Sequence, residues 1–340
     1  MPRYRSQFHP AADMKLTIEQ ATDLAVSALS RHGLSSEHAC QVADHLVESA
    51  LCGHEFSSLP RVAAIVEELR AKTTAPTPIE LVREDGSCAH IDGGDNIGYV
   101  VSLTAVDKAV EIARQLGVAV VTADNTWFSG RCAYYVERAA RQGFVALHTT
   151  NTTARVAPFG GAERIMGTNP FAIAFPCKAD PIVIDIGTSA ITWGDVVLAR
   201  TKGEPLPDGV AVDPAGEVTR DPQAALDGAF MPWGRQRGSA LALAVQLLGI
   251  LAGSAPVIAG TGGYGLLFVV IDPARVGAGG GFEAQAAELR RIVTASRALA
   301  GNAWVRMPGD GSQSRKQQSL GEGYIAVDDK VYARLVELAR

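Results

Sequence analysis

Two runs rich in large apolar residues constrain the fold of this chain most, because each is only as long as a single strand. Residues 181–189 read "PIVIDIGTS" and residues 265–273 read "GLLFVVIDP", without the polar alternation of a strand that has one face in water. Continuous Val, Ile and Leu runs are typical of strands that are buried on both faces of a sheet. We therefore expect both segments to be strands that are covered on either side.

The other segments alternate between helix and strand patterns. Thr17 and Gln20 form a capping box before a helix that "HG" at 32–33 ends, and a second helix starts at Ser35 or Ser36 and runs to about Ala50. The pattern predicts further strands at 87–94, 117–125 and 144–151, and further helices at 60–72, 99–115, 130–142, 238–252, 283–299 and 328–339. The helix at 238–252 is expected to be buried because it is apolar. The alternation predicts an α/β protein of about two domains, which suits 340 residues.

Charge and hydropathy exclude two classes of partner. The net charge of −5 leaves no basic surface for a nucleic-acid backbone. The longest apolar run, 240–252, contains Gln246 and is too short to cross a bilayer. We expect neither a nucleic acid nor a membrane as partner.

The cysteines and histidines indicate a cytoplasmic protein without a metal site. Five dispersed cysteines without a CxxC pair are typical of thiols in a reducing compartment. Residues 1–14 lack the apolar core of an export signal, and we expect them to form a mobile arm. The seven histidines never pair with Cys or Glu at the spacing of metal ligands.

A glycine-rich segment at 260–265, "GTGGYG", matches the phosphate loop of dinucleotide-binding domains at Gly260, Gly262 and Gly265. That loop works only between a strand and the N-terminus of a helix, whose amides face the pyrophosphate. Here the expected order is reversed, with a helix before the motif and a strand after it. We interpret the segment as a flexible loop.

Two loops after expected strands carry the polar groups that suit a phosphorylated ligand. The region 148–195 is rich in Thr, Asn and Gly, and Asn151 stands where the strand at 144–151 enters its loop. Hydroxyls, amides and open backbone N–H groups suit a polyhydroxylated, phosphorylated molecule. Turn formation alone explains the same composition equally well, since Asn-Pro and Gly-Thr are common in turns.

An ordered set of motifs resembles the malate/L-lactate dehydrogenase-like family of NAD(P)-dependent oxidoreductases. The motifs are "APFGG" (157–161), "GTNP" (167–170), "IDIGTSAI" (184–191), "GDV" (194–196), "LDGAFMPWGRQRGSALAL" (226–243) and "MPGD" (307–310). The resemblance covers about residues 17–335. "TSAITWGDV" is most similar to the branch that reduces Δ1-piperideine-2-carboxylate and Δ1-pyrroline-2-carboxylate, whereas other branches reduce 2-oxo acids.

The resemblance implies an α/β fold that binds NAD(P) without a Rossmann domain. It places a mostly helical part at 15–75 plus 305–340 and an α/β cofactor- and substrate-binding domain at 76–304. It also implies a homodimer. The positions that match the family's cofactor contacts are Thr168, Asn169, Asp185, Thr188, Ser189, Gly309 and Asp310, to which Asn151 is added as a neighbouring candidate.

Two arginines stand in the segment where family members commonly have a lysine. Arg235 and Arg237 bring guanidinium groups, which bind phosphate oxygens in bidentate fashion. We therefore expect NADPH as the cofactor, with NADH as the alternative. The other interpretation is that one of the two arginines only caps a surface.

The family's general acid is a histidine in a Ser-His-Gly pattern that precedes Arg-Leu-Pro, and "GHEFSSLPR" (53–61) offers two candidates for its position. Alignment backwards from "LPR" gives His54, which keeps a group suited to proton transfer near neutral pH. Alignment forwards from 31–33 gives Ser57, which loses it. Asp195 matches a carboxylate of the imine-reducing branch, and its alternative is a solvated helix residue.

The substrate-facing positions depart from the family pattern. Trp127 and Phe128 stand where the family often has a His-His-Phe-like run, and Ser58 replaces the Arg before Leu-Pro, with Arg61 nearby. These changes indicate a bulkier or less charged substrate than pyruvate, or a specialised imine. The resulting hypotheses are a reductase of a cyclic imine carboxylate, a 2-oxo acid or 2-hydroxy acid dehydrogenase, and a nucleotide-binding member that has lost its acid.

Overall fold

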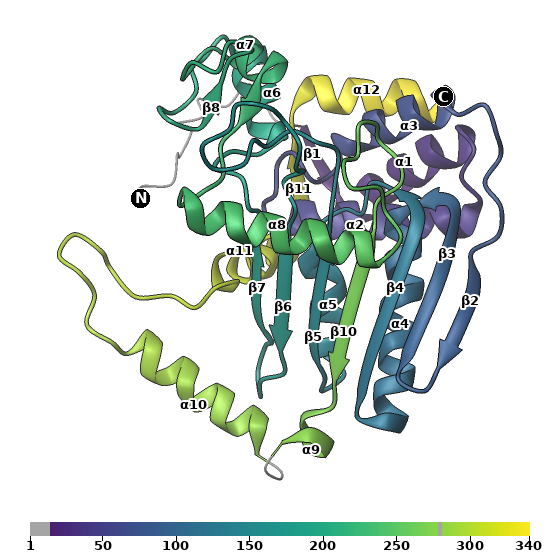
Figure 1. The fold of residues 1–340 in the computed structure, drawn as a ribbon, viewed down its shortest axis with the longest axis vertical. Helices are drawn as coiled ribbons and strands as arrows, with labels where there is room; N and C mark the ends of the chain where they lie inside the picture. The colour runs from purple at the N-terminus through teal and green to yellow at the C-terminus, as the bar shows by residue number, and fades with distance from the viewer. Residues whose placement is uncertain (1–13, 278–280) are drawn as a thin grey trace. The chain divides into compact units, whose positions relative to one another are not determined.

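The computed structural model describes residues 14–277 and 281–340, so all but the last residue of the expected N-terminal arm lies outside the described chain. The chain divides into two compact units. Figure 1 shows the helices and strands of both as a ribbon. The first unit comprises the described residues up to Thr74 together with Ser312–Arg340, and the second comprises Ala75–Gly311. Gly309 and Asp310 therefore belong to the second unit. Among the described residues, no helix is long and apolar enough to cross a membrane.

The first unit is mostly helical. It contains α1 (Ile18–Arg31), α2 (Ser36–Leu51), α3 (Arg61–Ala71) and α12 (Asp329–Ala339), with a two-stranded sheet of β1 (Met14–Thr17) and β11 (Tyr324–Val327). The capping box is confirmed, since Thr17 and Gln20 exchange side-chain-to-backbone hydrogen bonds at the start of α1. The expected helices at 60–72 and 328–339 are confirmed as α3 and α12. Helix α11 (Asp310–Glu322) begins in the last residues of the second unit and continues in the first.

The second unit is built on a mixed seven-stranded sheet in the order β2-β3-β4-β10-β5-β6-β7. The β3–β4 pair is parallel and the other pairs are antiparallel. The strands span β2 (Glu80–Asp85), β3 (Cys88–Ile97), β4 (Val118–Trp127), β5 (Val145–Thr150), β6 (Phe171–Phe175), β7 (Ile182–Ile186) and β10 (Leu266–Ile271). The α/β class expected from the sequence is confirmed, with a mixed central sheet.

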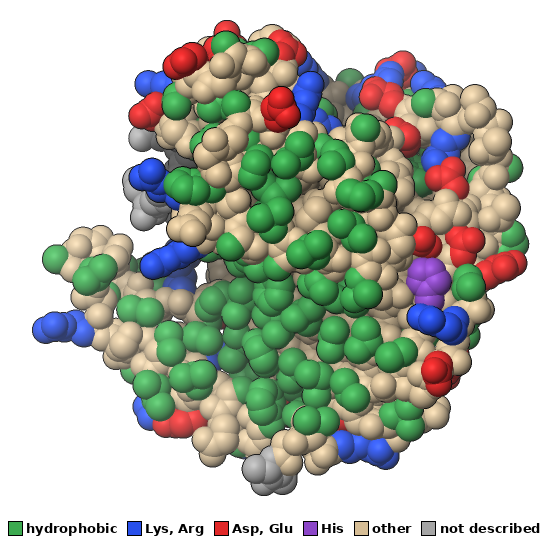
Figure 2. All heavy atoms as spheres, viewed as in Figure 1, with side chains coloured by type: hydrophobic (Ala, Val, Ile, Leu, Met, Phe, Trp, Pro, Cys, Tyr) green, Lys and Arg blue, Asp and Glu red, His purple; other side chains and the backbone are tan. Residues whose placement is uncertain are grey.

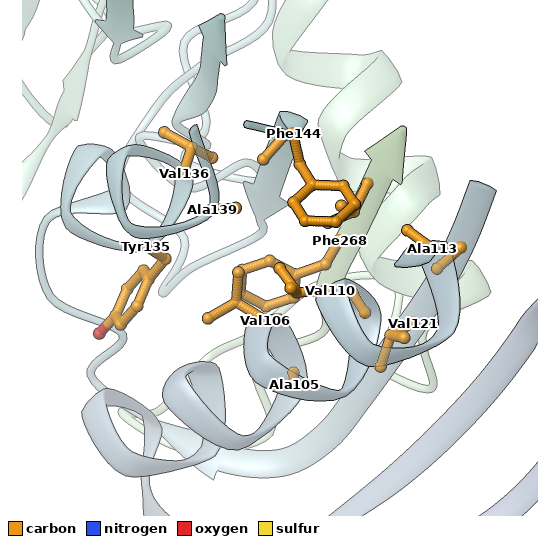
Figure 3. Packing of buried hydrophobic residues seen from close by; sticks show 14 of the residues in the cluster. Ala105, Val106, Val110, Ala113, Val121, Tyr135, Val136, Ala139, Phe144 and Phe268 are labelled. Carbon is orange, nitrogen blue, oxygen red and sulfur yellow. The ribbon is translucent and has the colours of Figure 1, made fainter. Parts of the chain in front are cut away.

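One face of this sheet carries the main hydrophobic core. Helices α4 (Gly98–Leu116) and α5 (Cys132–Ala140) cover it, and Phe268 of β10 packs among Val106, Val110 and Tyr135 (Figure 3). Helix α8 (Gln236–Leu251) lies on the opposite face, across β5 and β10 (Figure 1). A smaller core joins α6 (Trp193–Lys202) and α7 (Pro222–Asp227) to β8 (Ala211–Val212) and β9 (Ala229–Phe230). Helices α9 (Pro273–Val276) and α10 (Phe282–Thr294) follow β10.

Two burial predictions were wrong, although the elements form where they were expected. Strand β7 is the last strand of the sheet, and Ile186 at its end is exposed. Helix α8 has large aliphatic side chains in solvent, Leu247 and Leu251 among them. Strand β10 lies in the centre of the sheet and its first three residues are buried, as expected. An apolar run in the sequence does not show whether other parts of the same chain bury its side chains.

Glycines allow α8 to lie close against the strands. A Cβ on Gly249 would collide with the side-chain amide of Asn151, and a Cβ on Gly265 would collide with the backbone of Gly249. The Asn151 amide is fully buried, donates to Ser254 Oγ and accepts from the Gly265 N–H. Helix, loop and strand therefore meet at a single buried amide.

Replacing Gly249 by alanine is expected to lower the free energy of unfolding by about 1–3 kcal/mol, because the methyl group displaces the Asn151 amide. Gly321, in α11, has nothing within 4 Å of an added Cβ. Gly321→Ala is the matched control and should be neutral or stabilising, because alanine is the better helix former. Urea unfolding of both variants measures the difference, and equal stabilities would contradict the close contact.

A buried histidine makes stability depend on pH. His148 is stacked on Phe268 with ring centroids 3.9 Å apart and donates from Nδ1 to the Leu267 carbonyl, while burial lowers its pKa to about 4. The unfolded chain takes up the proton near pH 6.5, before the folded chain does. Stability should therefore fall as the pH drops from 6.5 to 4, by on the order of 3 kcal/mol. Urea unfolding at several pH values in this range should show this loss of stability in wild type but not in His148→Gln. An equal loss in both proteins would assign it to other groups.

Candidate functional site

Two loops of the second unit, the one between β5 and β6 and the one after β7, leave the sheet at the same end of its strands, and the segment before α8 joins them. Strands β5 and β7 end there and β6, antiparallel to both, starts there. The Thr188 N–H and hydroxyl donate to the Thr168 carbonyl at 2.9 and 3.0 Å, and the Trp233 N–H donates to the Thr188 carbonyl at 3.0 Å. Ser189 also bridges to Pro232. The "GTNP", "DIGTS" and "PWGRQRG" segments are thus joined by main-chain hydrogen bonds.

Two buried asparagines hold these loops in place. Asn169 is fully buried in a left-handed conformation with φ 35°, and its amide donates to the Ala242 carbonyl and to Gln246 Oε1 of α8. Its Oδ1 accepts from the Thr152 N–H. Asn151 is buried in the same way. Both side chains bond to protein groups, so their role is to shape the loops.

Asp185 lies where β7 meets α5. Its Oδ2 accepts from the Ala133 N–H at 2.8 Å, which places the carboxylate at the N-terminus of α5. Part of the residue faces solvent, but burial of the carboxylate raises its pKa, against the lowering influence of the Ala133 N–H and of Arg131. The Ser189 hydroxyl, further along, donates to the Ile191 carbonyl.

Arg235 and Arg237 are both exposed at the start of α8. Arg235 precedes the first helical residue, and its guanidinium lies 5.6 Å from the centroid of the Phe159 ring. Its backbone has φ 59° and ψ −122°, a conformation that disfavours side chains with a Cβ. Two cations at the N-terminus of a helix form a place where an anion is stabilised.

The "PGD" loop lies against β7. Gly309 has φ 86°, and a Cβ there would come within 2.9 Å of the Val183 carbonyl oxygen. Asp310 Oδ2 accepts from the Met307 N–H at 2.9 Å, and Arg290 of α10 pairs with Asp310 at 3.7 Å. The structure therefore brings the predicted positions at 168, 188–189 and 235 together, and sets 309–310 beside the strand that carries Asp185.

Asp195 has a structural partner. It is the third residue of α6 and forms a capping box with Thr192, whose hydroxyl donates to Asp195 Oδ2 at 2.7 Å. The side chain is otherwise exposed. This is the geometry of the solvated helix residue that the sequence left as the alternative.

The second predicted cluster lies in the first unit, at the end of α2. The His54 N–H donates to the Ser49 carbonyl, and His54 Nε2 lies 3.4 Å from Ser312 Oγ of α11. The side chain of Arg315 covers Gly53, where a Cβ would be 2.5 Å from Arg315 Cδ. Ser312 and Arg315 had no signal in the sequence, because they stand more than 250 residues from His54 and match none of the quoted motifs.

The remaining candidates differ in exposure. Ser57 is exposed, whereas Ser58 is buried and donates to the Glu55 carbonyl. Arg61 begins α3 with its guanidinium 5.8 Å from the Phe56 ring. Trp127 is 1% exposed and donates from Nε1 to the Asp95 carbonyl, so it is a core residue, while Phe128 is half-buried beside it.

The donor set of the second unit fits a phosphorylated dinucleotide. Two exposed arginines supply hydrogen-bond donors and positive charge beside these loops, whose own shape is fixed by the Thr188 and Ser189 hydroxyls donating to main-chain carbonyls. In the described part of the chain, no group of three or more His, Cys, Asp or Glu residues is placed to hold a metal ion.

Comparison with known proteins gives a consistent picture. The model of the malate/L-lactate dehydrogenase family matches residues 16–336. The chain is 32% identical over 334 residues to an L-sulfolactate dehydrogenase of Methanocaldococcus jannaschii, covering 96% of each chain. It is 32% identical to a ureidoglycolate dehydrogenase (NAD(+)) of Escherichia coli K12, covering 95% of each. The solved structure of Δ1-piperideine-2-carboxylate reductase from Pseudomonas syringae pvar. tomato superposes with a TM-score of 0.86 at 29% identity, over 96% of this chain and 99% of that one.

The strained backbone at residue 235 yields a stability prediction. Arg235→Gly should raise the free energy of unfolding by about 1 kcal/mol, because glycine adopts this conformation without strain. The neighbouring Gly234 has φ 57° and open space around it, so Gly234→Ala should be destabilising by a similar amount. Thermal unfolding of the pair measures both shifts. A loss of stability in Arg235→Gly would mean that contacts of the side chain outweigh the strain.

Proposed function

The chain belongs to the malate/L-lactate dehydrogenase family of oxidoreductases, and from that premise we propose that it interconverts a small 2-hydroxy acid and its 2-oxo acid with NAD(P). The observation that carries the proposal is the joining of three polar loops beside Arg235 and Arg237. Relatives aligned along nearly the whole chain act on hydroxy acids by their names, which supports this substrate class.

The cofactor is held, in this proposal, by the loops at 168, 188–189 and 309–310. When bound, the nicotinamide ring supplies or accepts the hydride. Thr168 and Ser189 are half-buried at the proposed site, and the buried Thr188, Asn151 and Asn169 keep the loops in place through their hydrogen bonds. The exposed arginines favour NADPH, because guanidinium groups suit a 2′-phosphate, with NADH as the alternative.

His54 is proposed as the proton-handling residue. Its backbone is fixed by the Ser49 carbonyl and its ring by Ser312, so the imidazole has a defined orientation. An imidazole exchanges a proton near neutral pH. Ser57 is the alternative occupant of the family position, and a chain with Ser57 there would keep the nucleotide site without the acid. Arg61 is proposed to contact the substrate carboxylate.

A cyclic imine carboxylate is the second candidate substrate. The likeness to the Pseudomonas reductase and the segment "TSAITWGDV" favour it. Two arguments for an imine have become weaker, however. The Asp195 carboxylate caps the N-terminus of α6, and the Trp127 side chain lies in the core, away from solvent. For this reason the hydroxy acid is the first candidate here.

The remaining family expectations are proposals too. We expect a homodimer in the cytoplasm, and a cofactor fold other than the Rossmann type. The position of "GTGGYG" supports the last point, because α8 precedes the segment and β10 follows it. Gly260, Gly262 and Gly263 instead line a cavity of about 320 Å³ with Asp124 and Asn125.

The test is oxidation of NADPH and NADH by pure protein with oxaloacetate, pyruvate, 3-sulfopyruvate and Δ1-piperideine-2-carboxylate. His54→Ala should lower kcat by roughly 10²–10⁴-fold with the best substrate, the range expected for loss of a general acid. His38→Ala, near the start of α2, is the control and should leave the rate unchanged.

Each outcome assigns a role. A rate that survives His54→Ala but falls in Ser57→Ala would move the site to Ser57. Turnover of the imine alone would select the second candidate. Binding of NADPH, followed by fluorescence, without turnover of any of the four substrates would contradict the proposed activity.

A further inference from the structure

Helix α11 turns one polar side towards the end of α2 in the first unit. Ser312 Oγ lies 3.4 Å from His54 Nε2, and the Ser319 hydroxyl donates to the Leu51 carbonyl at 3.4 Å. Arg315 stands three residues after Ser312 and four before Ser319, and residues at these spacings share one side of a helix. Arg315 therefore belongs to the side of α11 that faces the proposed proton donor.

The Arg315 side chain lies across Gly53, the residue before His54. A Cβ on Gly53 would be 2.5 Å from Arg315 Cδ, 3.2 Å from its Nη1 and 3.4 Å from its Nε, so a larger residue at this position would displace the guanidinium group. Gly53 also has φ 76°, a conformation that favours glycine. The glycine thus leaves room for a permanently charged group next to the residue that carries the imidazole.

No carboxylate compensates the charge of Arg315 within the described chain. Its neighbour Lys316 pairs with Glu48 at 2.9 Å, and both of these side chains are mostly buried. Arg315 is exposed, and within residues 14–277 and 281–340 it forms no ion pair with an Asp or a Glu. Of two adjacent cations, one is neutralised by its own chain and the other is open to an anion from solution.

An exposed cation without a partner carboxylate is informative because the chain is acidic overall, with a net charge of −5. Figure 2 shows a face of the molecule on which hydrophobic side chains dominate over α8 and the strands below it. Such a surface offers an anion little to bind. The end of α2 differs, because a guanidinium group and an imidazole are both held there.

The position of Arg315 bears on a substrate expectation drawn from the sequence. Ser58 stands where the family pattern has an arginine before Leu-Pro, and its side chain is buried and donates to the Glu55 carbonyl at 2.9 Å. Arg61 is the cation that remains in that stretch, with its guanidinium 5.8 Å from the Phe56 ring. The missing arginine indicated a less charged substrate, but α11 supplies a guanidinium group, that of Arg315, which this expectation did not include.

We propose that Arg315 is a specificity-determining residue that binds a second anionic group of the substrate, while Arg61 contacts the carboxylate beside the reacting carbon. A guanidinium group binds a carboxylate, and by the same geometry a sulfonate, through two parallel hydrogen bonds. The inference rests on the proposed function and deepens it: the substrate class becomes a 2-hydroxy acid, or its 2-oxo acid, with a carboxylate or sulfonate on the next carbon. Substrates without this second group lose the interaction with Arg315.

The alternative is a structural role. Arg315 lies near the last residues of α2, and a cation is stabilised at the C-terminus of a helix. That role predicts that Arg315→Gln lowers the unfolding temperature and changes the kinetics of all substrates alike. Recognition of an anion predicts a change for dianionic substrates only, so the two roles give different results.

The first test compares dianionic with monoanionic substrates in the full chain, with NADPH as cofactor. Arg315→Gln should raise KM at least about tenfold for oxaloacetate and 3-sulfopyruvate and less than about twofold for pyruvate, because a lost hydrogen bond between charged groups is worth this factor. Arg315→Lys should keep part of the preference, since it keeps the charge without the planar fork. Arg334→Gln, which removes an exposed arginine of α12, is the matched control and should change no KM.

The second test measures binding without turnover. Malate and lactate cannot react with NADPH, because ligand and cofactor are both reduced, and their binding in its presence is followed by the NMR signal of the His54 ring, assigned with His54→Ala. Wild type should bind malate at least about tenfold more tightly than lactate, and Arg315→Gln should bind both equally. If Arg315→Gln does not fold, wild type and Arg315→Lys carry the comparison.

The outcomes separate the inference from the proposed function. A preference for malate that depends on Arg315, without turnover of any substrate, would leave the anion site standing and contradict the proposed activity. Turnover with equal changes of KM for pyruvate and oxaloacetate in Arg315→Gln would overturn the role of Arg315 and leave the activity standing. Equal binding of malate and lactate by wild type, or binding of neither, would overturn that role too.

Discussion

The contact on which the second unit depends is the close approach of α8 to the sheet. It is possible only because residues 249 and 265 lack side chains, and it brings the helix within reach of the buried amides of Asn151 and Asn169. An unpaired buried amide costs free energy, so the loops cannot move away from α8 without breaking these hydrogen bonds at a cost in stability. The polar loops of the candidate site therefore depend on the position of α8.

The same helix explains why local structure was readable from the sequence and burial was not. Capping boxes, glycine stops and apolar spacing are local, and they located α1, α2, α4, α8 and β10 within a few residues. Whether a side chain is buried depends on neighbours from elsewhere in the chain. For α8 and β7 the apolar signal was real, but it concerned a surface that this chain leaves exposed.

The residues of the candidate site were likewise predictable only in part. The loop residues at 168, 188 and 235 came from motif order, and they do lie together in the second unit. The sequence could not show that Asp195 is used as a helix cap, since a capping box and an active-site carboxylate share one residue type. Nor could it find Ser312, whose contact with His54 joins the two ends of the chain.

The order of strands has a consequence for how the protein is made. Strand β10 lies between β4 and β5, although more than a hundred residues separate it from β5, and β11 pairs with β1 across almost the whole chain. The sheet of the second unit has a gap until residue 271 has been synthesised, and the first unit lacks β11 and α12 until residue 339 has been synthesised. Such long-range pairing slows folding. Both units therefore reach their final form only after their last segments have been synthesised, and until then the unfinished sheet exposes unpaired strands that are prone to aggregate.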